Sequence, residues 1–178
     1  TARDGFRRAM DAMLDQVILA RSIRDDSGAI VDFEIEFANT AALASTRRLA
    51  EDTVGRRVRE LYPGLVTSGL FDRFCRVVET GVPWEVERLQ YQDRAADGRE
   101  VSGWWSLQVM AVDDGYLAAS RDVTEVVEAD RLAAEAREAV EREHLAVDLL
   151  QRAALPTTLP HIDGLDLGAH YRPAALRQ

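Results

Sequence analysis

A seven-residue run of strict alternation, residues 31–37, constrains the fold more than any other part of the sequence. Its odd-numbered positions hold valine, phenylalanine, isoleucine and phenylalanine, and its even-numbered positions are all acidic. Successive side chains of a β-strand point to opposite faces, so this run predicts a strand with one apolar face and one acidic face. Other parts of the chain must cover the apolar face, which consists of Val31, Phe33, Ile35 and Phe37.

A second strand precedes this run. Residues 17–23 alternate loosely between apolar and polar positions, and the turn signal Asp26-Ser27-Gly28 separates the two segments. Two strands joined by a short polar turn indicate a β-hairpin. Before the hairpin, residues 6–14 carry apolar side chains at the three- and four-residue spacing of an amphipathic helix.

Short helices are expected after the hairpin. Asn39 stands where its side-chain oxygen can accept a backbone N–H group in the first turn of a helix. Residues 47–62 are polar and helix-capable in pieces, as far as the stop signal Pro63-Gly64. Residues 70–80 form the clearer helix, because their apolar positions share one side and Gly81 can end the helix in a left-handed conformation.

Three further strands are predicted in a meander. Residues 84–91 change the face of their apolar positions midway, which indicates a bulge. The turn Asp97-Gly98 leads to a strand over residues 101–111, and Asp114-Gly115 is a preferred two-residue hairpin turn before a last strand at residues 116–120. This order of elements predicts an α+β fold with a five-stranded antiparallel sheet, whose helices cover one face and can enclose a small pocket.

Residues 5–124 resemble a PAS domain in this order of elements. Arg121-Asp122-Val123-Thr124 resembles the Asp-x-Thr signature that closes the last PAS strand. Asp122 or Thr124 can satisfy backbone N–H groups where the strand becomes a helix. The resemblance implies the PAS fold for residues 1–124 and a role in sensing a signal.

The next segment, residues 125–155, contains no proline or glycine and is rich in helix-forming residues. We expect a long helix that relays the signal and pairs with a second subunit as a parallel coiled coil, the alternative being a solvated helix on its own domain. One seam position is mostly valine and alanine: Val126, Ala133, Val140, Val147 and Ala154. The partner position is weaker: Ala129, Ala136, Glu143 and Leu150.

The last block of the sequence resembles the beginning of bacterial PPM-type serine/threonine phosphatases of the sporulation-regulator class. The resemblance is carried by Leu149-Leu150-Gln151-Arg152, Pro156 and Tyr171-Arg172-Pro173-Ala174. It implies that residues 156–178 begin a phosphatase domain. Such a domain would use two manganese or magnesium ions to remove phosphate from a downstream phosphoprotein. The metal-binding aspartates of that family follow this block, so Asp163 and Asp166 are not assigned to metal. We expect the chain to be a fragment without catalytic residues or metal ligands.

Charge and composition exclude several classes of function. The chain carries 31 acidic and 22 basic residues, for a net charge of −9, whereas a nucleic-acid-binding domain needs a basic face. Cys75 is the single cysteine, which excludes an internal disulfide. No apolar run approaches the length of a membrane span, and no signal peptide is recognisable, so we expect a cytoplasmic protein.

The candidate sites follow from the expected fold. No cofactor is evident, but an unknown small ligand can occupy the pocket. The predicted pocket residues are Phe37, Phe71, Phe74, Trp84, Trp105 and Leu107, although aromatic residues at such spacings are more often plain core. The predicted signal relay consists of Asp122, Thr124, Val126, Val140, Val147 and Leu150.

Two special PAS classes do not fit the sequence. Heme-binding PAS domains commonly use a histidine of a core helix, and residues 1–124 contain no histidine. The flavin-binding subgroup carries an asparagine-cysteine-arginine-phenylalanine-leucine motif, which Phe74-Cys75-Arg76 does not reproduce. Cys75 is therefore expected to be a buried small hydrophobe.

Two other functions remain open. The chain can be the sensor region of a histidine kinase, with His144 as the phosphate acceptor, although Pro156 and Pro160 interrupt the helix that a kinase would continue. It can also be a PAS dimerisation module that binds no ligand.

Overall fold

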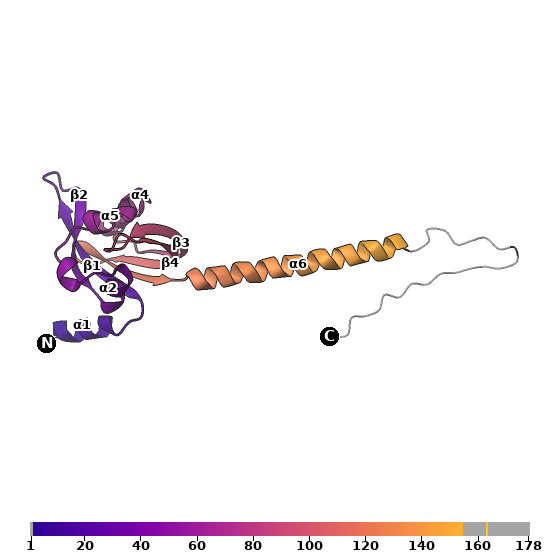
Figure 1. The fold of residues 1–178 in the computed structure, drawn as a ribbon. Coiled ribbons are helices and arrows are strands. Elements are labelled where there is room, and N and C mark those ends of the chain that lie inside the picture. The colour runs from indigo at the N-terminus through magenta and orange to yellow at the C-terminus, as the bar shows by residue number, and fades with distance from the viewer. Residues whose placement is uncertain (1, 155–162, 164–178) are drawn as a thin grey trace. The chain divides into compact units, whose positions relative to one another are not determined.

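The computed structural model describes residues 2–154 and residue 163, and its centre is one antiparallel sheet of five strands (Figure 1). The spatial order of the strands is β2-β1-β5-β4-β3, so the first hairpin lies beside the last strand. The predicted α+β fold with a five-stranded sheet, short helices and a long C-terminal helix is confirmed. The strands are β1 (Gln16–Arg24), β2 (Ile30–Ala38), β3 (Trp84–Arg94), β4 (Glu100–Ala111) and β5 (Gly115–Asp122).

A group of short helices connects β2 to β3 and packs on the sheet. Helix α2 packs against β1, α3 against β2, α4 against β3, and α5 against β4 and β5. The helices are α1 (Ala2–Asp11), α2 (Thr40–Thr46), α3 (Val58–Leu61), α4 (Pro63–Thr67), α5 (Leu70–Thr80) and α6 (Thr124–Ala154), with a 3₁₀ turn at Ala50–Asp52.

An aromatic cluster forms the core between the helices and the sheet. The Phe33 ring lies 4.8 Å from the Tyr116 ring in an edge-to-face arrangement and 5.4 Å from the Phe71 ring. Phe74 lies 4.9 Å from Tyr116 on the other side. All four side chains are at most 3% exposed. Aromatic rings bury large apolar areas, and edge-to-face pairs add stability beyond the burial itself, so this cluster anchors the helices on the sheet.

Two register shifts interrupt the predicted apolar face of β2. Ile35 pairs with Ala20, whereas Phe37 pairs with Leu19, so Glu36 has no partner in β1. Because Leu19 and Ala20 are neighbours in one strand, Phe37 lies on the face of the sheet opposite to Ile35. The prediction that residues 31–37 present one continuous apolar face is therefore wrong at Phe37, whose ring lies beneath Arg7 of α1. It is also wrong at Val31, which the other shift leaves without a partner in β1 and which is 37% exposed.

Asn39 caps α2, as predicted, and also ties three elements together. Its Oδ1 atom accepts the Ala42 N–H at 3.0 Å and the Val17 N–H at 2.9 Å. Its Nδ2 group donates to the carbonyl oxygens of Met10 and Asp15. The side chain is fully buried with all of its hydrogen-bonding groups used, which fixes the start of α2 relative to β1.

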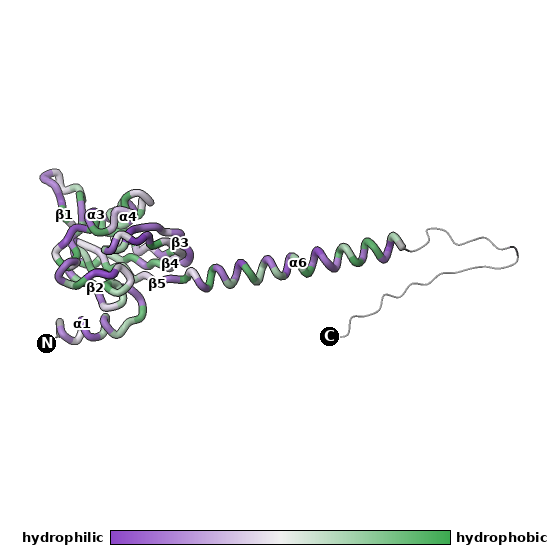
Figure 2. Tube along the Cα trace, viewed as in Figure 1, coloured by the Kyte–Doolittle hydropathy of each residue, from purple (hydrophilic) through white to green (hydrophobic). Residues whose placement is uncertain are grey.

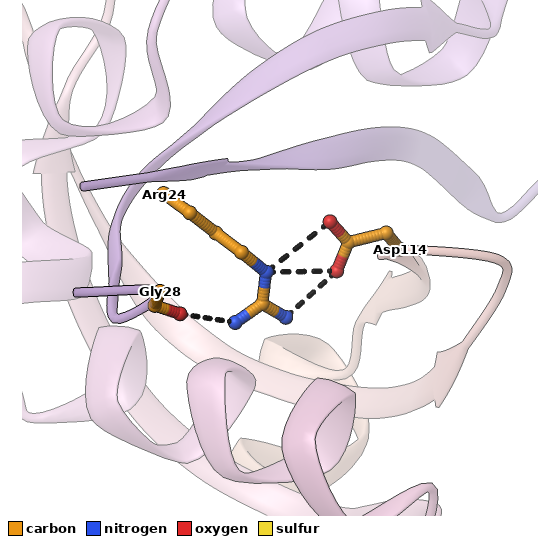
Figure 3. A network of polar contacts seen from close by, with 3 residues as sticks. All are labelled: Arg24, Gly28 and Asp114. Carbon is orange, nitrogen blue, oxygen red and sulfur yellow. Dashed lines mark hydrogen bonds and ion pairs between the residues drawn. The ribbon is translucent and has the colours of Figure 1, made fainter. Parts of the chain in front are cut away.

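An ion pair joins the tips of the two hairpins (Figure 3). The guanidinium group of Arg24 donates to the Asp114 carboxylate at 2.7 and 3.2 Å, and to the Gly28 carbonyl oxygen at 2.7 Å. Arg24 is the last residue of β1, and Asp114 lies in the β4–β5 turn, 90 positions further along the chain. Hydrogen bonding to Arg24 lowers the pKa of Asp114.

The chain divides into two compact units, and the boundary between Ala129 and Asp130 falls within helix α6. Within the second unit, every side chain from 130 to 153 is exposed. Apolar and polar residues alternate along the helix (Figure 2), and Val140, Val147 and Leu150 are 50%, 44% and 71% exposed. None of the described helices is long and apolar enough to cross a membrane. The block that resembles a phosphatase lies outside the described residues from residue 155 on, apart from Asp163.

Candidate functional site

A cavity of about 130 Å³ lies between the helix-covered face of the sheet and helices α2, α4 and α5. Strands β1 and β5 contribute Ile18 and Ala118 to its wall, and α5 contributes Leu70. Most of the lining side chains are apolar or aromatic, a composition typical of small-molecule sites. The cavity is the candidate ligand site of this domain.

The structure brings together three of the six predicted pocket residues. Phe74, Trp105 and Leu107 line the cavity, and their part in ligand binding stays a prediction. Phe37, Phe71 and Trp84 are not among the lining residues, which corrects the sequence interpretation.

Phe37, Phe71 and Trp84 lie outside the cavity wall for different reasons. The bulge at Glu36 turns Phe37 to the other face of the sheet. Phe71 packs on Phe33, and Arg59 lies 4.2 Å from its ring centroid. Trp84 is the first residue of β3, and Arg73 lies 5.3 Å from its ring centroid.

The cavity wall has a polar part that was not among the pocket residues predicted from the sequence. It includes Tyr91 and Asp93, which lie on one face of β3 together with Leu89. The Tyr91 hydroxyl donates a hydrogen bond to Asp93 Oδ2, and burial together with this carboxylate raises the pKa of Tyr91, so the phenol keeps its proton. Alternation after the predicted bulge in β3, which is confirmed by a register shift between Val86 and Leu89, could have identified both residues.

The junction between β5 and α6 lies beside the cavity-lining strand β4. Asp122 Oδ1 accepts the Thr124 N–H at 2.9 Å, as the capping argument predicted. The Thr124 hydroxyl oxygen accepts the Trp104 N–H at 2.9 Å, so it extends the β4–β5 ladder by one side-chain bond. A Cβ atom on Gly103 would lie 2.5 Å from that hydroxyl, which explains why glycine stands there. The role of Asp122 and Thr124 in a signal relay stays a prediction.

A sequence profile described as PAS fold matches residues 28–128, more than half of the chain. The chain belongs to the PAS family. A search of curated proteins found no match.

The PAS fold also appears in the similar solved structures. A light-oxygen-voltage protein of Rhodobacter sphaeroides is 14% identical with a TM-score of 0.54, covering 81% of this chain and 79% of its own. An RNA-binding light-oxygen-voltage receptor is 19% identical with a TM-score of 0.53 over 80% of this chain, which spans only 38% of the receptor's length. A PAS domain of a Colwellia psychrerythraea protein is 20% identical with a TM-score of 0.48 over 70% of this chain and 99% of its own. The two matches with TM-scores above 0.5 show the fold alone, because their identities to this chain are below 25%.

Cys75 of this PAS domain has the properties of a packing residue. It lies half-buried in α5 and packs against the core. Burial raises the pKa of its thiol to about 11, so the thiol stays protonated and unreactive near neutral pH. Among the described residues, no group of three histidine, cysteine, aspartate or glutamate side chains is placed to hold a metal ion.

Proposed function

We propose that this PAS domain is the regulatory sensor module of a cytoplasmic bacterial serine/threonine protein phosphatase. The cavity binds a small ligand, and α6 carries the resulting change to the phosphatase as part of a dimeric helix. The observation that carries this proposal is that strand β4 both lines the cavity and contacts the start of α6. Trp105 and Leu107 line the cavity, and the neighbouring Trp104 is bonded through its amide to Thr124, the first residue of α6.

A change in the cavity can reach α6 through this strand. A ligand that moves Trp105 also moves the peptide group between Trp104 and Trp105, and thereby changes the hydrogen bond to Thr124. Signalling of this kind requires two arrangements that differ by a few kcal/mol and bind the ligand unequally. The relay then runs from Asp122 and Thr124 into α6.

The exposed valines of α6 support pairing with a second copy. A helix of 31 residues with Val140 and Val147 at one heptad position has apolar surface that a parallel partner helix would cover. We expect the Val140→Glu substitution to lower the association constant of the dimer by about tenfold, because it places a charge in the seam between the two helices. Light scattering at several protein concentrations measures this constant.

Leu145→Glu is the matched control, because Leu145 also lies exposed on α6, at 64% against 50% for Val140, but falls outside both seam positions. Equal behaviour of the two variants, or a monomeric wild-type chain, would contradict the coiled coil.

The link to a phosphatase rests on the sequence resemblance of residues 148–174. The coding sequence of the parent protein after residue 178 provides the test, because a glycine-glycine-aspartate segment is expected there. The parent should then release phosphate from a phosphoserine protein in the presence of manganese. A continued pair of helices without paired aspartates would instead favour the histidine-kinase alternative, with His144 as acceptor.

A further inference from the structure

One hydrogen-bond donor in the cavity wall has no partner. Trp105 is a lining residue, and its indole Nε1 atom is buried with no hydrogen-bond acceptor among the described residues. A buried N–H group without an acceptor costs folding free energy, and such groups are rare in native structures. An acceptor from outside the described part of the chain would remove this cost.

Polar groups of α2 in the cavity wall already have partners inside the chain. The Ser45 hydroxyl lies 2.8 Å from Gln16 Oε1 and 3.0 Å from the Ala42 carbonyl oxygen. Thr46 Oγ1 donates to the Ala42 carbonyl oxygen at 2.9 Å. A ligand must replace existing hydrogen bonds to engage these groups, so it gains less from them than from a donor without a partner.

The charged residues of the cavity wall have opposite signs. Among the described lining residues they are Asp93 and Arg94. The Asp93 carboxylate accepts the Tyr91 hydroxyl and, at 2.8 Å, the backbone N–H of Arg94. Arg94 is exposed to solvent, which screens its charge. The wall therefore carries no net formal charge, and the Trp105 N–H is the polar group that gains most from a ligand.

The Trp105 indole lies next to the start of α6. A Cβ atom on Gly103 would lie 3.7 Å from Trp105 Nε1 and 2.5 Å from the Thr124 hydroxyl oxygen, so both groups border the space that the glycine leaves free. Nε1 itself has almost no exposed surface, so an acceptor in the cavity reaches it when the indole tilts toward the cavity. A bond at Nε1 therefore moves a ring that neighbours the Thr124 hydroxyl.

The remainder of the cavity suits a compact apolar body. Leu65, Leu70, Phe74 and Leu107 belong to this part of the wall. The cavity volume of about 130 Å³ is close to that of a leucine- and phenylalanine-lined cavity, about 150 Å³, that holds benzene.

We propose that the cavity binds a small carbonyl compound, a ketone, aldehyde or ester, whose carbonyl oxygen accepts the Trp105 indole N–H. Its apolar body, of about one six-membered ring, fills the remainder of the cavity. This inference rests on the proposed function only in taking the cavity as the sensing site.

Cyclohexanone and methylenecyclohexane are matched probes for the full chain. They share ring and shape, and differ in an oxygen atom that replaces a CH₂ group. The chain contains no lysine, so the ketone meets no side-chain amine with which to form an imine. The indole N–H resonance of Trp105 should move downfield on saturation with cyclohexanone but not with methylenecyclohexane, because a hydrogen bond deshields the proton.

Trp105→Phe assigns the affinity to the indole donor, because it keeps an aromatic ring and removes the N–H. It should lower the affinity for cyclohexanone by about tenfold and that for methylenecyclohexane by less than about threefold. The amide chemical shifts of Leu107 and Ala118, two lining residues, report binding during titration. Trp84→Phe is the matched control and should change neither affinity, since Trp84 does not line the cavity. The indole resonance of the wild-type chain remains decisive if Trp105→Phe fails to fold.

Three results would overturn the inference: an indole resonance of Trp105 that saturation with cyclohexanone does not move, equal losses of affinity for both probes in Trp105→Phe, or no response of the lining amides to either probe. These outcomes are separate from failure of the proposed function. That failure would appear in the Val140→Glu and Leu145→Glu comparison and in the coding sequence of the parent.

Discussion

The PAS domain and helix α6 place the same residue type in opposite environments. Val58 and Val109 are at most 1% exposed inside the domain, whereas Val140 and Val147 of α6 are 50% and 44% exposed. The domain covers its own apolar residues because the helices of the β2–β3 connection pack on the sheet. A single helix has no second layer of its own, so its apolar residues stay exposed until another helix covers them. The comparison separates a domain that buries its own apolar residues from a helix whose described apolar residues are exposed from residue 130 to 153.

Removal of a core ring should produce the largest effect. Phe33→Ala deletes a fully buried side chain that contacts the rings of Phe71 and Tyr116, so we expect about 3–5 kcal/mol of lost stability in urea denaturation. The surface substitution Val82→Ala serves as control, with an expected change within about 0.5 kcal/mol. A loss below about 1 kcal/mol for Phe33→Ala would show that the ring cluster does not hold the domain together.

A matched pair of valine substitutions tests the comparison directly. Val58→Ala should destabilise the domain by about 2 kcal/mol, since it removes two methyl groups from a closed core. Val140→Ala should leave the unfolding transition of the domain within about 0.5 kcal/mol of wild type. Equal losses in urea denaturation would mean that α6 packs on its own domain, the alternative that the sequence left open.

Thr124 is the point at which the two regions meet. Thr124→Val keeps the shape of the side chain and removes the acceptor of the Trp104 N–H, which should cost about 1–2 kcal/mol. Hydrogen exchange at the Trp104 amide should accelerate, while exchange in β1 stays unchanged. Thr80→Val, on the exposed end of α5, is a control without a role in the sheet. Unchanged protection of Trp104 would remove this bond from the proposed relay.

The ion pair between Arg24 and Asp114 should give the smallest effect, because the Asp114 side chain is 60% and the Arg24 side chain 33% exposed to solvent, which screens their attraction. The folded-state pKa of Asp114 is lowered, so its contribution is present above the unfolded pKa and is lost as pH falls through the folded pKa. Asp114→Asn should therefore lower the urea midpoint slightly at neutral pH and make no difference in strong acid. A difference that grows as the pH falls would contradict this sign.

Local patterns in the sequence predicted the elements that depend on near neighbours. The cap at Asn39, the turn at Gly98, the bulge in β3 and the long helix all follow from the preferences of a few adjacent residues. The predicted turn at Asp114-Gly115 is wrong by one residue: Asp113 and Asp114 form the turn, and Gly115 begins β5, where a Cβ atom would lie 2.1 Å from the Ala20 carbonyl oxygen.

The polar corner of the cavity was missed for a different reason. Alternation after the bulge in β3 places Tyr91 and Asp93 on one face with Leu89, but that this face lines a cavity depends on the packing of α4 and α5, which alternation does not express.

By itself the sequence determined the α+β class, the order of strands and helices, and the exposed apolar seam of α6, because these depend on periodicity within single segments. Only the tertiary structure decided which aromatic rings line the cavity. An unpaired Glu36 sends Phe37 to the far face of the sheet, and the pairing of β3 with β4 places Trp105 and Leu107 along the cavity. A one-residue shift in register reverses the direction of a side chain, and register is set by contacts between strands that are distant in the chain.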